Sequence, residues 1–231
     1  MPPAFDFETA VPWGRSCSEY QAFFALEGLP PDTRVLDCGA GPSSFAVEAT
    51  ERGLSVCAAD PLYSVSADRI AHRIEEVRPT MLASIRQAQA RFVWDQYGTP
   101  EKQEAVRLAA MQRFLADFGS HRREARYVAA ALPSLPFRDR AFDLALSSHF
   151  LLLYSKQFDL AFHLEAVREL LRVAGGLRIF PLLDLDGRRS HHVEPLRAAL
   201  AGDGFDSEVV RVDYEFQKGG NEMLRIEPNI Q

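Results

Sequence analysis

The sequence of 231 residues lacks features that would mark a membrane or a secreted protein. No apolar run approaches the ~18 residues that a membrane-spanning helix requires, and no basic-then-apolar leader begins the chain. Cysteine is scarce: three residues, an odd number, favour reduced thiols over a disulfide framework. We therefore expect a cytoplasmic protein that does not bind membranes.

Basic residues are also not in excess. The chain has 26 Lys and Arg against 32 Asp and Glu, a net charge of −6. Nonspecific nucleic-acid binding depends mainly on Lys and Arg, so nucleic acid is a disfavoured partner and a small-molecule substrate is expected.

The apolar content is high enough for a well-buried core. At 47% hydrophobic residues, the chain can form one α/β domain with an insertion, and it is short for two full domains. We expect a single domain over residues 1–231. Within it, residues 1–32 form an N-terminal helical segment and residues 64–125 a helical cap insertion.

A short apolar strand, a glycine-rich turn and a helix are predicted over residues 35–45, Val-Leu-Asp-Cys-Gly-Ala-Gly-Pro-Ser-Ser-Phe. Gly39 and Gly41 carry no Cβ, so this turn can be sharp and can approach a ligand closely. A second strand ends at Asp60, 19 positions beyond Gly41. An acidic side chain at about that distance hydrogen-bonds ribose hydroxyls in Rossmann-like sites. The unit is typical of nucleotide-binding proteins.

The glycine spacing separates two kinds of nucleotide site. The NAD fingerprint requires a third glycine where this chain has Ser44, and it does not require the acidic residue Asp37 two places before the first glycine. The run Asp37-x-Gly39-x-Gly41, with Asp60 ending the next strand, resembles motif I and the following acidic position of the class I S-adenosylmethionine (SAM) methyltransferases.

Two later segments extend this resemblance. Leu-Pro-Phe-x4-Phe-Asp-Leu at residues 135–144 resembles the loop and fourth strand of that family. Leu-Leu-Arg-Val-x-Gly-Gly at residues 170–176 resembles the helix end and turn before its fifth strand. The resemblance covers residues 33–60 and 126–226.

Alternating strands and helices predict a doubly wound sheet. Gln-Lys-Gly-Gly-Asn at residues 217–221 indicates a hairpin turn between the last two strands, which makes one C-terminal strand antiparallel, as in the methyltransferase sheet. The expected fold class is therefore α/β: a Rossmann-like, doubly wound, mostly parallel seven-stranded sheet with an antiparallel C-terminal strand and a helical insertion. Strands are predicted at residues 34–38, 55–59, 126–130, 142–147, 176–182, 207–214 and 222–227, and helices at 43–52, 158–173 and 192–201.

Between Asp60 and Arg126 the chain has no good strand, although a simple crossover needs only about a dozen residues. Apolar residues recur there at helical spacing, which predicts a helical cap over the carboxyl edge of the sheet, where open α/β sheets bind ligands. The predicted helical segments are residues 66–78, 79–97 and 100–118, separated at Pro79 and at residues 98–100.

A helix is also predicted before the first strand, over residues 19–27, with Ser16 or Ser18 as its N-cap. Such a segment often folds over the cofactor in the methyltransferase family, so the resemblance implies that residues 13–16 and Tyr20 line the cofactor pocket. The alternative is an amphipathic helix that packs on the sheet.

The resemblance implies SAM as cofactor, with Asp60 accepting from the ribose and Asp37 steadying the turn and reaching the SAM amino group through water. Many relatives place an acidic residue after the third strand to bind adenine, and this chain does not. Adenine recognition would then depend on backbone groups near Ala131 and Leu132 and on packing by Leu62. The predicted cofactor-binding residues are Asp37, Gly39, Ala40, Gly41, Asp60, Pro61, Leu62, Ala131, Leu132 and Ser148.

His149 follows the fourth strand, where this family exposes groups to the transferring methyl, and is the candidate general base. Tyr154 is a second catalytic candidate, and a histidine that only packs against the cofactor is the alternative. In the cap, Arg91, Trp94 and Tyr97 are candidate substrate contacts, although aromatic residues at helical spacing also form cores.

A metal site is not predicted. Asp184, Asp186, His191 and His192 lie in a loop without the helical i, i+4 pairing of a zinc hydrolase, and methyl transfer from a sulfonium needs no metal.

The sequence thus favours a SAM-dependent methyltransferase that acts on a small molecule by in-line methyl transfer. The Asn-Pro-Pro-Tyr type signature of DNA and glutamine amide N-methyltransferases is absent. An RNA or protein methyltransferase, a non-catalytic SAM-binding regulatory subunit and an NAD oxidoreductase are the alternatives.

Overall fold

The computed structural model describes residues 6–7, 11–120 and 126–229. Parts of the predicted N-terminal segment and the end of the predicted cap insertion lie outside these residues. Within the described ranges, no helix combines the length and the apolar character needed to cross a bilayer.

Seven strands form one sheet in the order β3-β2-β1-β4-β5-β7-β6. The first five strands pair in parallel, and β7 pairs antiparallel with both β5 and β6. The predicted fold class is therefore confirmed. The strands are β1 (Arg34–Cys38), β2 (Ser55–Ala59), β3 (Tyr127–Val128), β4 (Leu144–Ser148), β5 (Leu177–Phe180), β6 (Phe205–Arg211) and β7 (Glu222–Pro228).

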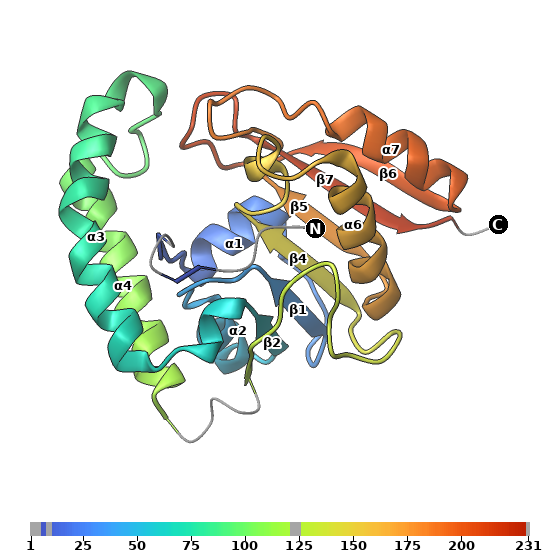
Figure 1. Cartoon of the computed structure of the whole chain (residues 1–231), viewed down its shortest axis with the longest axis horizontal. Helices are drawn as coiled ribbons and strands as arrows, with labels where there is room; N and C mark the ends of the chain where they lie inside the picture. The colour runs from blue at the N-terminus through green and yellow to red at the C-terminus, as the bar shows by residue number, and fades with distance from the viewer. Residues whose placement is uncertain (1–5, 8–10, 121–125, 230–231) are drawn as a thin grey trace.

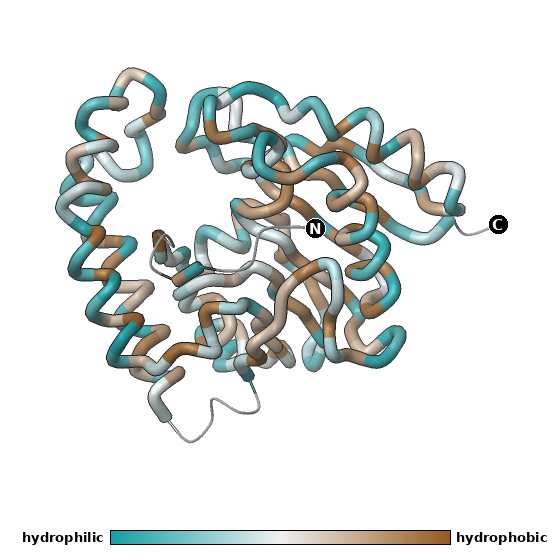
Figure 2. The backbone as a smooth tube through the Cα atoms, viewed as in Figure 1, coloured by the Kyte–Doolittle hydropathy of each residue, from teal (hydrophilic) through white to brown (hydrophobic). Residues whose placement is uncertain are grey.

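Helices cover both faces of the sheet (Figure 1). On one face, α6 and α7 pack over β4, β5 and β7 in one apolar core, and on the other α1 and α2 share a second core with the cap helices. Hydrophobic residues accordingly concentrate in the sheet, and hydrophilic residues occupy the outer loops (Figure 2). These helices are α1 (Cys17–Phe24), α2 (Phe45–Glu51), α6 (Leu160–Val173) and α7 (Val193–Gly202), and single 3₁₀ turns are η1 (Pro61–Ser64), η2 (Gln89–Arg91) and η3 (Leu152–Tyr154).

Helix α1 begins after Ser16, one of the two predicted caps. The Ser16 hydroxyl accepts from the Glu19 N–H, and the Glu19 carboxylate accepts from the Ser16 N–H, which completes a capping box. The helix ends at Phe24, three residues before the predicted end, and its C-cap Ala25 is in the left-handed region. Phe23 and Phe24 are fully buried against the sheet.

The region predicted as a cap contains an antiparallel helix pair, α3 (Ala67–Gln87) and α4 (Pro100–Phe118), which stands along one side of the molecule and is called the cap below (Figure 1). The predicted helix break at Pro79 is wrong, because α3 runs through this proline. Its buried face, with Ile74 and Val77 before Pro79 and Ile85 after it, continues on both sides. We attribute the intact helix to this burial, which offsets the roughly 3 kcal/mol that an internal proline costs.

The connection between α3 and α4 is fastened to the β6–β7 connection. The Val93 N–H donates to the Phe216 carbonyl at 2.7 Å, and the Lys218 N–H donates to the Arg91 carbonyl at 3.0 Å. The rings of Phe92 and Phe216 stack with centroids 4.6 Å apart. The tip of the cap is thus held to the C-terminal half of the chain.

The segment before α1 lies directly on the glycine-rich turn. The Arg15 carbonyl accepts from the Ser44 N–H at 3.0 Å and from the Ser43 hydroxyl at 2.9 Å. A Cβ on Gly14 would collide with the carbonyl oxygen of Pro42 and would lie 2.8 Å from Cγ of Met111. This contact therefore requires glycine at position 14.

Gly14→Ala is expected to lower the free energy of unfolding by about 1–3 kcal/mol, because the added methyl group forces the N-terminal segment away from the turn. Gly202→Ala is the matched control, since a Cβ there meets nothing within 4 Å and the residue is helical. Urea unfolding measures both. Equal stability of the two variants would contradict the tight packing of this segment.

Candidate functional site

The glycine-rich turn follows β1 at the carboxyl edge of the sheet. Gly39 and Gly41 have φ angles of 73° and 55°, which favour glycine. A Cβ on Gly39 would lie 3.0 Å from the Phe150 ring, whereas a Cβ on Gly41 would meet nothing within 4 Å. The backbone at Gly41 is therefore open to the close approach of a ligand.

Asp60 connects the ends of β1 and β2. Its carboxylate accepts from the Gly41 N–H at 2.8 Å and from the Leu62 N–H at 2.8 Å. Burial raises the pKa of this carboxyl, and the two N–H donors oppose the increase. A carboxylate has about four acceptor positions, so two remain for hydroxyl groups of a ligand.

Asp37 is fully buried near the end of β1. One of its oxygens accepts from the Tyr20 hydroxyl at 3.1 Å, and the other has no hydrogen-bond partner. Burial raises the pKa of Asp37 to about 8, the charge of Asp60 adds to the increase, and the bond from Tyr20 opposes it. An unfilled buried acceptor is costly unless a ligand donor completes it.

The other predicted cofactor-binding residues lie along the same edge. Ala40 is in the turn, Pro61 and Leu62 begin η1, and Ser148 ends β4. Ala131 is exposed and Leu132 is buried, and both follow β3, the strand at the margin of the sheet. Their role as ligands stays a prediction.

His149 occupies a left-handed conformation with φ 52° directly after β4. Its backbone N–H donates to the Phe180 carbonyl, and its ring Nδ1 lies 2.9 Å from the Ser148 hydroxyl. Burial lowers the pKa of His149 well below 6.5, and the charges of Arg15 and Arg107 lower it further. The imidazole is therefore neutral at pH 7, the form that can accept a proton.

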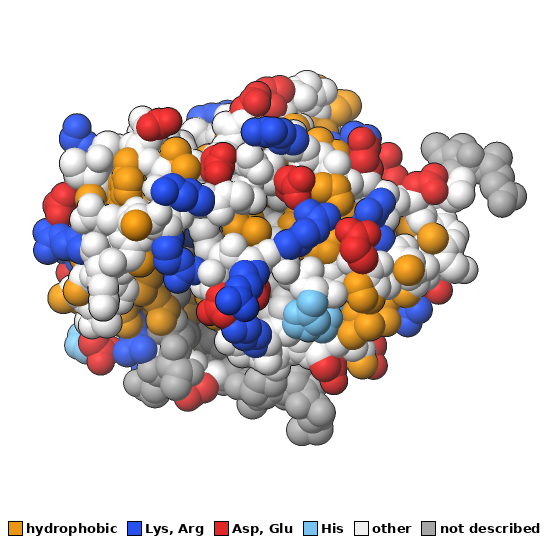
Figure 3. Space-filling view, turned by 90° about the horizontal axis from the view of Figure 1, so that it is seen from above, with side chains coloured by type: hydrophobic (Ala, Val, Ile, Leu, Met, Phe, Trp, Pro, Cys, Tyr) orange, Lys and Arg blue, Asp and Glu red, His pale blue; other side chains and the backbone are white. Residues whose placement is uncertain are grey.

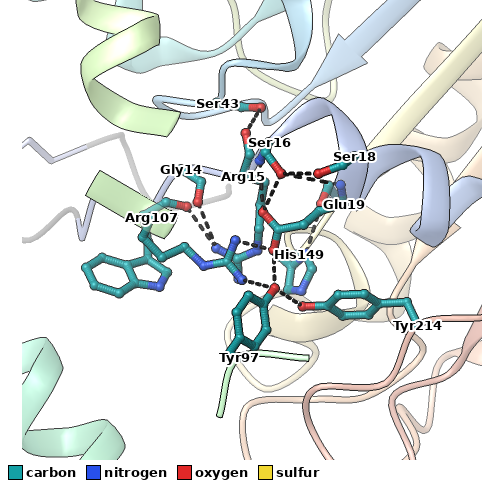
Figure 4. Close-up of polar contacts among 12 residues, drawn as sticks. Gly14, Arg15, Ser16, Ser18, Glu19, Ser43, Tyr97, Arg107, His149 and Tyr214 are labelled. Carbon is teal, nitrogen blue, oxygen red and sulfur yellow. Dashed lines mark hydrogen bonds and ion pairs between the residues drawn. The ribbon is translucent and has the colours of Figure 1, made fainter. Parts of the chain in front are cut away.

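A buried polar cluster lies beside His149 (Figure 4). Arg107 of α4 is 0% exposed and forms an ion pair with Glu19 of α1, which is 1% exposed. The Tyr97 hydroxyl donates to Glu19 at 2.6 Å and lies 2.9 Å from the Tyr214 hydroxyl. Burial raises the pKa of Glu19, but the charges of Arg107 and Arg15 outweigh it and bring the pKa to about 2.

The sequence analysis missed Glu19, Arg107 and Tyr214 as site residues. A signal was present in α4, where Arg107 shares one helical face with the buried apolar side chains of Met111 and Phe114. A cation on such a face indicates a buried partner. Nothing local indicates that this partner is Glu19, which lies 88 positions away.

The three predicted substrate residues separate in the structure. Tyr97 lies in the cluster of Figure 4. Trp94 donates from its ring to the Gln89 carbonyl and packs edge-on against Phe216, in the fastening of the cap. Arg91 is exposed and donates to the Leu185 carbonyl. Of the three, only Tyr97 joins Glu19 and Tyr214 in this cluster.

Tyr154, the second catalytic candidate, lies in η3, and burial raises its pKa. In the loop after β5, Asp184 accepts from the N–H groups of Asp186 and Arg188, as a turn residue does. His192 turns its Nε2 toward the carbonyls of Ser155 and Phe158.

Asp37→Asn is expected to raise the Tm, because the variant removes a carboxyl that resists ionisation. The folded carboxyl stays protonated until about pH 8, whereas the unfolded chain ionises near 3.8. The difference in free energy of unfolding between the variant and the wild type therefore grows as the pH rises from about 4 to about 8, and reaches about 1–3 kcal/mol. Calorimetry at both ends of this range measures it, with the exposed Asp206→Asn as control. An advantage that shrinks as the pH rises would contradict the assignment.

The chain is similar to several known proteins. No protein-family model matches the chain. The uncharacterized protein MJ0045 of Methanocaldococcus jannaschii is 30% identical over 214 residues, which are 92% of this chain and 94% of that protein. The chain belongs to the same family as MJ0045.

Among solved structures, a chain from the complex of the Haloferax volcanii Trm112 methyltransferase activator with a protein described as a methyltransferase has a TM-score of 0.51 at 13% identity. The alignment covers 93% of this chain and 89% of that one. The SAM-bound magnesium protoporphyrin IX methyltransferase ChlM of Synechocystis PCC 6803 has a TM-score of 0.49 at 12% identity, over 91% and 76% of the two chains. This protein, a member of the MJ0045 family, has the class I methyltransferase fold.

Proposed function

We propose that this protein is a SAM-dependent methyltransferase that acts on a small-molecule acceptor. The observation that carries the proposal is the arrangement of Asp37, Gly41 and Asp60 at the carboxyl edge. Two carboxyl groups from neighbouring strands flank an open glycine backbone, in a sheet with the methyltransferase strand order.

The residues fit the cofactor. The unpartnered oxygen of Asp37 offers an acceptor to its amino group, and the two remaining acceptor positions of Asp60 suit ribose hydroxyls. Leu62, with backbone groups of Ala131 and Leu132, would hold the adenine. When bound, SAM supplies a methyl group that its sulfonium charge already activates.

With an activated donor, the main task of the protein is to orient the acceptor. An in-line displacement proceeds fastest when nucleophile and methyl carbon are held about 3–3.5 Å apart and collinear with the leaving sulfur. In this proposal, neutral His149 takes the proton that the acceptor loses. Its backbone bond to Phe180 and its contact with Ser148 fix the imidazole.

A small acceptor is favoured over RNA or protein by the closure of the cap. The stacked pair Phe92 and Phe216 joins the cap tip to the C-terminal hairpin, and Arg107 beneath it is fully buried. The face in Figure 3 shows basic and acidic side chains interspersed rather than a continuous basic groove. Exposed ion pairs such as Lys156 with Asp186 and Arg189 with Glu222 also place opposite charges side by side on the surface.

Isothermal titration with S-adenosylhomocysteine (SAH) tests the cofactor. Asp60→Ala is expected to weaken SAH binding by roughly 10- to 150-fold, the equivalent of a charge-assisted hydrogen bond of about 1.5–3 kcal/mol. Asp206→Ala, at an exposed position on β6, is expected to bind as the wild type does. Binding of NAD without binding of SAH would overturn the proposal.

His149→Asn is expected to lower kcat by about 10²- to 10⁴-fold with little change in SAH affinity, if the imidazole removes a proton during transfer. Asparagine tolerates the left-handed backbone at this position. The rate of SAH formation is measured with a small-molecule acceptor that the wild type methylates, found by screening a panel of such compounds. Because the pKa of His149 is lowered, the acid limb of the wild-type profile should lie below pH 6.5.

An unchanged kcat in His149→Asn, with weakened SAH binding, would assign this histidine to cofactor packing. SAH binding without turnover on any acceptor would instead favour a non-catalytic SAM-binding subunit.

A further inference from the structure

The cluster beside His149 holds more positive than negative charge. Besides burial, the charges of Arg15 and Arg107 both lower the pKa of His149. The charge of Arg107 lowers the pKa of Arg15 by more than the carboxylate of Glu19 raises it. Glu19 instead raises the pKa of Arg107, its ion-pair partner. Among the described residues, Glu19 is the carboxylate that acts on Arg15, and it is already paired with Arg107. Within this cluster of described residues, two guanidinium groups are therefore set against one carboxylate, with His149 neutral.

The acceptor capacity of Glu19 is used up. One oxygen receives the Tyr97 hydroxyl and Arg107, and the other receives the N–H and the hydroxyl of Ser16. Glu19 therefore has no position left for Arg15.

The side chain of Arg15 is half-buried, and among the described residues its guanidinium hydrogen-bonds only within its own segment. Its Nη1 donates to the carbonyls of Trp13 and Gly14 at 3.1 and 3.3 Å. Its Nε, like that of the fully buried Arg107, is shielded from solvent without a hydrogen-bond acceptor. Two shielded guanidinium donors without acceptors are costly in a folded protein, and an anionic ligand would complete them.

The surroundings of Arg15 belong to the acceptor side of the site. The charge of Arg15 lowers the pKa values of His149, Tyr154 and Tyr214. The groups that act on Asp37, where the amino-acid end of the cofactor is proposed, are instead Tyr20 and Asp60. On the other side, His149 packs against the buried rings of Phe23 and Phe180, with centroids at 5.1 and 5.5 Å from its own.

We propose that the methyl acceptor is a small molecule that carries a carboxylate, and that Arg15 binds this carboxylate. The inference rests on the proposed function, because it names the acceptor class of the same site. A guanidinium can bind a carboxylate through two parallel hydrogen bonds, which fixes the orientation of the acceptor as well as its affinity. Arg107, held by Glu19, adds to the positive potential.

Benzoate and its neutral analogue benzamide are the probes, titrated into the protein with and without SAH. We expect benzoate to bind at least tenfold more tightly than benzamide. Arg15→Gln should remove this difference, and Arg15→Lys should retain part of it, because lysine keeps the charge without the fork of donors. Arg138→Gln, at an exposed position, is the matched control and should bind benzoate as the wild type does.

Three outcomes would overturn the inference: no binding of benzoate, equal binding of benzoate and benzamide, or unchanged benzoate binding in Arg15→Gln. In the last case, a tenfold loss of SAH affinity would assign Arg15 to the carboxylate of the cofactor. Failure of the proposed function is read separately, from the absence of SAH binding to the wild type. The titration of benzoate without SAH still decides whether Arg15 binds a carboxylate.

Discussion

The buried ion pair between Glu19 and Arg107 holds together the elements that surround the carboxyl edge of the sheet. It joins α1 to α4, two helices that are far apart in the sequence, and Tyr97 and Tyr214 extend it to the cap tip and the C-terminal hairpin. Removing one partner of such a pair leaves an unpaired buried charge, at a cost of about 3–5 kcal/mol. The N-terminal segment, the cap and the C-terminal hairpin are thus fixed relative to one another by a single polar centre in an apolar core.

This centre divides the edge into two electrostatic halves. The half at the glycine turn carries the carboxyl groups of Asp37 and Asp60, and the half under the cap carries Arg15 and Arg107. His149 lies in the cationic half, and the field of the two arginines, together with burial, keeps its imidazole neutral. For the methyl transfer proposed here, this division suits a donor whose amino group and ribose hydroxyls meet carboxyl oxygens on one side, an anionic acceptor on the other and a neutral proton acceptor between them.

Local patterns were sufficient to predict the sheet. Alternation of short apolar runs and helical periodicities placed all seven strands, and the hairpin signal at residues 217–221 predicted the reversed strand. The predicted third strand shrank to two residues, and the helix break at Pro79 did not occur. Burial on both sides of Pro79 is a tertiary effect that a local proline rule does not contain.

The site divides in the same way. Asp37, Gly41 and Asp60 were predictable because each ends a strand or forms a turn, and parallel strands place such ends together. Glu19, Arg107 and Tyr214 were not, because their pairing joins positions separated by 88 residues or more in the sequence. Arg15 was placed near the pocket from the resemblance, but its unpaired charge emerged only when its neighbours were known.

The structure of this protein crystallised with SAH tests the central claim most directly. The account predicts that the ribose hydroxyls bond to Asp60, that the amino-acid end lies near Asp37, and that the sulfur faces His149. SAH bound away from residues 37–41, or with its ribose out of reach of Asp60, would contradict it.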